Sequence, residues 1–153
     1  MKRYQFRLEA VRKMRAMHEE TCRNELGLLM VERQNILNQI ESLTQDIKAA
    51  YVEQEVHLVT GMKASHAAYF PQAVAGREGQ IKLLQKNLEM ADARISDKKI
   101  ELAQKRADLK LMENLREKDH AAWKNAYAKE ENLKVDEMVQ MWSESRKDQG
   151  ETR

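Results

Sequence analysis

Few residues in this chain have the types and spacing that catalysis or metal binding requires. His18 and Cys22 lie one helical turn apart and offer two metal ligands, whereas a structural metal site takes four. The remaining histidines have no ligand spacing among themselves; they are His57, His66 and His120. No glycine-rich phosphate loop ending in Lys-Ser or Lys-Thr occurs in the sequence. We therefore predict no catalytic residue, no metal site and no cofactor, and we expect a protein that is not an enzyme and does not hydrolyse nucleotide.

The composition favours long helices as the elements that carry the other residues. Of the 153 residues, 34% are charged, 42% are hydrophobic and only 5% are aromatic, which suits helices better than strands. Cys22 is the single cysteine, so no internal disulfide can form and a reducing compartment fits best. No apolar run approaches the roughly 20 residues that span a bilayer, and the basic start lacks an apolar signal core. A soluble, cytoplasmic, helical protein is expected.

Apolar residues recur at steps of three and four in two segments, which is the spacing of a coiled-coil seam. The first stripe consists of Leu26, Leu29, Ile36, Ile40, Leu43 and Ile47, with Arg33 in one slot. The second consists of Ile81, Leu84, Leu88, Ala91, Ile95, Leu102, Leu109 and Met112, with Lys98 and Lys105 in two slots. The stripes predict helices over about 4–58 and about 80–145, with a frayed tail at 146–153, all in one coiled-coil domain over 1–153.

The residues that break helices gather between the two stripes. The stretch TGMKASHAAYFPQAVAGREG holds the only proline, Pro71, and three of the five glycines. Gly61 can end the first helix in a left-handed conformation, and Gly76 and Gly79 can flank the start of the second. The sequence therefore predicts a bend near residues 59–79.

Charge blocks distinguish the two folds that this pattern allows, an antiparallel hairpin within one chain and a parallel dimer. The blocks alternate in sign, with net charges of +5 for 1–16, −5 for 17–58, +4 for 80–129 and −3 for 130–153. A hairpin sets opposite blocks side by side, whereas a parallel dimer stacks like on like. We therefore predict an all-α fold, an antiparallel two-helix coiled-coil hairpin that forms a long rod and is monomeric on its own.

The expected register leaves part of the second helix without an opposing chain. If residue 58 faces residue 80, Leu8 faces about Glu130, and the chain end projects beyond the N-terminus. Apolar residues on this projection, among them Met138, Met141 and Trp142, would stay exposed, and adaptable methionines on an exposed stripe suit partner binding. The basic start is also typical of a nucleic-acid footprint, but a net charge of only +2 and the acidic tail favour a solvated helix end. No nucleic-acid partner is expected.

The sequence resembles the FliJ family, the small coiled-coil proteins of the bacterial flagellar export apparatus. The start YQFRLEAVRKMRAMHEE is similar to the Phe-x-Phe-Arg-Leu-Glu opening of that family, with Tyr4 where Phe is common. GMKAS at the bend resembles the family's Gly-Met stretch between helices. The segment ENLREKDHAAWKNAYAKEENLKVDEMVQMW resembles the end of its second helix; the matching residues are Leu115, Lys118, Tyr127, Asp136 and Glu137. Pro71 departs from the family pattern.

The resemblance implies a role in type III protein export. FliJ-like proteins act as the central stalk of a hexameric export ATPase, resemble the coiled-coil gamma subunit of rotary ATP synthases, and also contact the export gate's cytoplasmic domain and export chaperones. On that basis the contacts with the ATPase ring are expected from Arg7, Arg12, Lys13, Arg15, Met138, Met141 and Trp142. The contact with the gate is expected from Tyr51, Tyr69 and Phe70. The protein is then expected in the cytoplasm, peripheral at the inner membrane and held there only by its partners.

One alternative belongs to another functional class. A cytoplasmic coiled-coil scaffold that tethers two partners without regulating an ATPase fits the same composition, and so does the related stalk of an injectisome, which is YscO-like. A nucleic-acid-binding arm is a more distant alternative. The identity of the neighbouring genes, and the effect of the protein on a cognate ATPase, distinguish these hypotheses.

Overall fold

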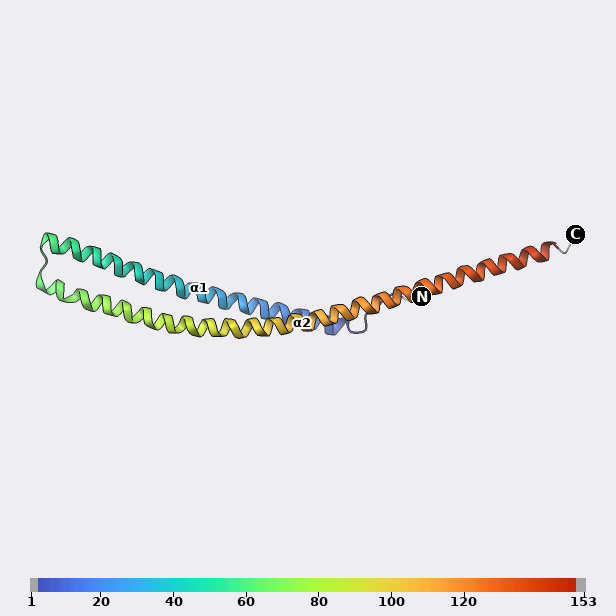
Figure 1. The fold of residues 1–153 in the computed structure, drawn as a ribbon, viewed down its shortest axis with the longest axis horizontal. Helices are drawn as coiled ribbons and strands as arrows, with labels where there is room; N and C mark the ends of the chain where they lie inside the picture. The colour runs from blue at the N-terminus through green and yellow to red at the C-terminus, as the bar shows by residue number, and fades with distance from the viewer. Residues whose placement is uncertain (1–2, 151–153) are drawn as a thin grey trace. The chain divides into compact units, whose positions relative to one another are not determined.

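The computed structural model describes residues 3–150, with side chains described up to residue 147, and it is all-α (Figure 1). Helix α1 comprises Glu9–Thr60 and helix α2 comprises Ala64–Gly150, and no strand occurs in the described range. The two helices pack against each other in antiparallel directions, which confirms the predicted hairpin. None of the described helices contains an apolar stretch long enough to cross a membrane.

The chain divides into two compact units. The terminal unit combines the residues up to His18 with those from Lys105 onward, and the loop unit comprises Glu19–Gln104. Each helix contributes to both units. The prediction of a single domain over 1–153 stays a prediction.

The connection between the helices is shorter than the sequence indicated. Gly61 ends α1 with a φ of +92°, the left-handed cap that was predicted, and α2 begins at Ala64. The connection thus lies inside the predicted range of 59–79, but the second helix starts well before residue 80 and includes Pro71. An interior proline costs a helix about 3 kcal/mol, and burial in this stretch, where Val74 is only 5% exposed, opposes that cost.

The two helix ends also differ from their predicted positions. Helix α1 begins at Glu9 and not near residue 4, because Tyr4 is engaged in a contact with α2 and residues 3–6 have no regular structure. Helix α2 continues to Gly150, past the predicted helix end at 145, and the predicted fraying of 146–153 stays a prediction. Residues 151–153 lie outside the described part of the chain.

Burial confirms the predicted seams. In the loop unit, every slot from Leu26 to Ile47 and from Ile81 to Leu102 is partly or fully buried, including those of Arg33 and Lys98. Ala91, Ile95 and Leu102 are among the most buried, at 2%, 7% and 5% exposed. In the terminal unit the second stripe continues through the half-buried Lys105 and Leu109 to Met112, which is 4% exposed. The stripe also extends upstream to residues that the sequence pattern did not reveal, namely Phe70, Val74 and Arg77.

The register of the hairpin differs from the predicted one. Within the loop unit Arg33 pairs with Asp92 and Tyr51 packs on Phe70, and within the terminal unit Arg15 bonds to residue 108. The expected opposition of Leu8 and Glu130 is wrong, because Leu8 borders the same hollow as Leu115 and Asp119. The short connection causes this difference, since it lets the chain reverse at residues 61–63. As a result, a longer part of α2 has no opposing chain, and all side chains of 131–147 are exposed.

Candidate partner-binding surfaces

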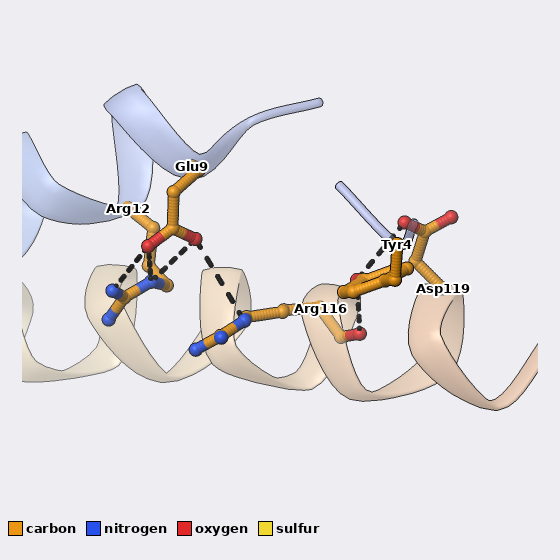
Figure 2. A network of polar contacts seen from close by, with 5 residues as sticks. All are labelled: Tyr4, Glu9, Arg12, Arg116 and Asp119. Atoms are coloured by element: carbon orange, nitrogen blue, oxygen red, sulfur yellow. Dashed lines mark hydrogen bonds and ion pairs between the residues drawn. The ribbon is translucent and has the colours of Figure 1, made fainter. Parts of the chain in front are cut away.

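A network of polar contacts joins the start of the chain to α2 in the terminal unit (Figure 2). The Tyr4 hydroxyl lies 3.2 Å from two acceptors, the main-chain oxygen of Arg116 and Oδ2 of Asp119. Glu9 receives hydrogen bonds from Arg12, the shortest at 2.6 Å, and pairs with Arg116 at 3.8 Å. These contacts fix where the start of α1 lies along α2.

The same contacts shift two pKa values. Desolvation, followed by the hydrogen bond to the Asp119 carboxylate, raises the pKa of Tyr4 above 10.0. The hydrogen bond from the Arg12 guanidinium lowers the pKa of Glu9 below 4.5. Both side chains therefore keep the charge state that their partners require at neutral pH, a neutral phenol and an ionised carboxylate.

An aromatic cluster accompanies this network. The ring of Tyr4 lies 4.7 Å from that of His120 and 5.7 Å from that of Trp123, and Trp123 stacks on Tyr127 at 5.4 Å. The helical spacing of Trp123 and Tyr127 was recognised in the sequence, but the participation of Tyr4 and His120 was not. Their contact depends on the register, which was predicted incorrectly.

The four cationic residues predicted to contact a ring fall into two pairs. Arg12 is engaged with Glu9, and Arg15 donates a 3.0 Å hydrogen bond to the main-chain oxygen of Asp108. Arg7 and Lys13 are exposed. The structure thus leaves the second pair more accessible to a partner than the first.

The three apolar residues predicted for the same contact lie on the unopposed part of α2. Met138, Met141 and Trp142 are 57%, 68% and 69% exposed. They are not brought together with the cationic residues. Tyr4, which precedes those residues in the chain, contacts α2 at Trp123, and Trp142 lies roughly 28 Å further along α2 at 1.5 Å per residue. Further apolar side chains are exposed beside them, namely Leu133, Val135 and Val139.

The aromatic residues predicted for a gate contact lie in the loop unit. Tyr51 and Phe70 are brought together, with ring centroids 5.5 Å apart in an edge-on arrangement that joins α1 to α2. Tyr69 makes no such ring contact in the described structure and is 75% exposed. Of the three, Tyr69 is therefore the most accessible, while Phe70 contributes to the seam.

Ion pairs in the loop unit connect the two helices across the seam. Lys98 bonds to Glu25 at 2.7 Å and to Glu101 at 2.8 Å, and the two carboxylates raise its pKa. Arg33 pairs with Asp92 at 2.6 Å. These pairs satisfy Arg33 and Lys98, the charged residues in the seam slots of the loop unit, and they favour the observed register over neighbouring ones.

Comparison with protein families gives one decisive match. The family model described as Flagellar FliJ protein matches residues 4–147, nearly the whole chain. The chain belongs to the FliJ family. It is therefore a component of the flagellar type III export apparatus, and the family is a non-catalytic one. Neither the curated proteins nor the solved structures include a significant match.

Proposed function

We propose that this FliJ-family protein is the central stalk of the flagellar export ATPase, where it promotes assembly and activity of the hexameric ring. One observation carries the proposal: the terminal unit presents an exposed apolar helix surface on residues 131–147. Six large apolar side chains are exposed on this stretch of helix, and contiguous exposed apolar surfaces mark sites of protein interaction.

The stalk stimulates the ring through differential binding. A stalk contacts several subunits only when they surround it, so it binds the hexamer and not the free subunit. Binding then stabilises the hexamer by about 2.7 kcal/mol when the stalk concentration is 100 times its dissociation constant. Met138, Met141 and Trp142 supply apolar contact, and the exposed Arg7 and Lys13 face acidic groups of the ring.

The loop unit provides a second surface in this proposal. Tyr69, with the half-exposed Tyr51 beside it, contacts the export gate's cytoplasmic domain, while Phe70 holds Tyr51 in place. The protein also receives export chaperones. It is monomeric when free, lies in the cytoplasm, reaches the inner membrane only through these partners, and binds no nucleic acid.

The test combines ATPase rate and sedimentation of the cognate export ATPase with and without the protein. Wild-type protein is expected to increase both the hexamer fraction and the turnover per subunit, while the protein alone shows no turnover. The triple variant Met138→Ala, Met141→Ala, Trp142→Ala is expected to lose most of the stimulation. Charge reversal at Arg7 and Lys13 is expected to weaken it and reduce its sensitivity to salt.

Tyr69→Ala is the matched control, because it removes an exposed aromatic side chain from the loop unit. It is expected to leave the stimulation intact. A scaffold or tether, the alternative, binds its partners but changes neither oligomerisation nor turnover. Absence of stimulation by folded wild-type protein therefore refutes the stalk function, and equal losses from the triple variant and from Tyr69→Ala refute the assignment of the surface.

A further inference from the structure

The unopposed part of α2 has one apolar side. At about 100° per residue, four apolar residues fall within an arc of about 100°, at the spacing i, i+3, i+4 and i+7. They are Val135, Met138, Val139 and Trp142, and each is between 54% and 69% exposed. This is the pattern of anchors with which an amphipathic helix binds an apolar groove. We call these four residues the apolar side.

The other exposed apolar residues of the segment point elsewhere. Leu133 precedes Val135 by two residues, which turns it by about 200° around the helix, and Met141 precedes Trp142 by one residue, which turns it by about 100°. Exposure does not distinguish these two residues from the apolar side, since Leu133 is 62% and Met141 is 68% exposed. A partner that binds the apolar side buries its four residues together and leaves Leu133 on the opposite side of the helix.

The charges along the apolar side are acidic. Residues 135–145 include no lysine or arginine but three carboxylates, those of Asp136, Glu137 and Glu144. Within the part of the chain whose side chains are described, none of these three forms an ion pair. Lys134, which directly precedes the segment, pairs with Glu130 and Glu131 at 3.3 Å, and these two carboxylates raise its pKa. Its charge is therefore already engaged.

We propose that the apolar side binds a surface of the partner protein that is apolar at its centre and bordered by lysine or arginine. This inference rests on the proposed role of residues 131–147 in binding, and it adds which side of the helix is bound and what chemistry receives it. Burial of the four anchors supplies the affinity, while basic groups at the border complement the carboxylates and steer association. The acidic charge disfavours an anionic lipid surface, since helices that lie on such surfaces have basic polar faces.

The test uses the full-length chain with Trp123→Phe, so that Trp142 is the one remaining tryptophan. The probe is an amphipathic helical peptide with leucine on one face and lysine at the border of that face, compared with the same peptide carrying glutamate in place of lysine. Contact with the leucine face should move the emission of Trp142 to shorter wavelength, because the indole leaves water. The lysine peptide is expected to bind about tenfold more tightly than the glutamate peptide at low salt, and the difference should shrink at high salt.

Two alanine variants test which side of the helix is bound. Val139→Ala is expected to weaken binding of the lysine peptide about five- to tenfold, because it removes methyl groups that contact the leucine face. Leu133→Ala is the matched control, since Leu133 has a similar exposed fraction, 62% against 59%, and its substitution removes a larger apolar group from the opposite side of the helix. It is expected to leave the affinity unchanged.

Equal weakening by the two variants overturns the assignment of the bound side, and equal affinity for the two peptides overturns the basic border. The same emission shift with phosphatidylcholine–phosphatidylglycerol vesicles would assign the apolar side to a lipid surface, and a dimer of the free chain that Val139→Ala abolishes would assign it to a second copy; either result overturns the proposal. The ATPase is absent from these measurements. A chain that stimulates the ATPase but prefers neither peptide therefore refutes this inference alone, and the converse result refutes the stalk function alone.

Discussion

Replacing glycine by alanine at two positions tests the observed connection between the helices. Gly61 has a φ of +92° and Gly76 lies within α2, and a Cβ added at either position meets nothing within 4 Å. The two substitutions therefore differ only in the backbone conformation that the new alanine must adopt. Gly61→Ala forces an L-residue into the left-handed region at a cost of about 1–2 kcal/mol. Gly76→Ala removes a helix-interior glycine and stabilises by about 0.5–1 kcal/mol.

The two substitutions should therefore shift the thermal midpoint in opposite directions. For a chain of this size each kcal/mol corresponds to about 2–4 °C. We expect Gly61→Ala to lower the midpoint by about 2–8 °C and Gly76→Ala to raise it by about 1–4 °C, as followed by far-UV circular dichroism. If residues 64–79 were part of a bend, Gly76→Ala would not stabilise. A fall of similar size in both variants would refute the helical assignment of this stretch.

Two further predictions concern the seam and the start of α1. Leu102 is 5% exposed, and Leu102→Ala is expected to lower the free energy of unfolding by about 2 kcal/mol in chemical denaturation, near the low end for buried leucine. Leu83 lies in the same unit but is 61% exposed, and Leu83→Ala should lower it by only about 0.5 kcal/mol. Equal losses from the two variants would contradict the seam. The folded-state pKa of Glu9 is lowered, so the ionised carboxylate stabilises the fold above pH 4.5, and this contribution is lost as the pH falls through the folded-state pKa. In a pH series of melting curves, the melting temperatures of Glu9→Gln and wild type should therefore converge in acid. A difference in melting temperature that stays constant with pH would contradict the contacts of Glu9 with Arg12 and Arg116.

The long periodic segments were predictable from the sequence. The stripes from Leu26 to Ile47 and from Ile81 to Met112 are inward-facing as predicted, since a repeated spacing of three and four leaves one helix face to bury. The hairpin was also predicted correctly, although the charge blocks do not pair as expected. Arg15 bonds to the main chain at Asp108, which lies far before the acidic tail that was predicted to face it.

The connection and the register were less predictable, because tertiary contacts override local signals. Pro71 and Gly76 are typical helix breakers, yet burial of Val74 and the contact between Phe70 and Tyr51 hold this stretch in α2. No local pattern reveals those contacts until the register is known. The aromatic cluster was not predictable for the same reason, since Tyr4 joins His120 and Trp123 only in the observed register.

Unequal helix lengths leave part of α2 in the terminal unit without an opposing chain. Helix α1 has 52 residues and α2 has 87, so a hairpin with a three-residue connection must leave the end of α2 unopposed. A separate helix as short as 131–147 would be marginal in water, because helix nucleation is costly. As a continuation of a paired helix it needs no nucleus of its own. Its apolar side chains are therefore presented on a preformed helix, and a partner that binds them loses less free energy to ordering than it would with a flexible tail.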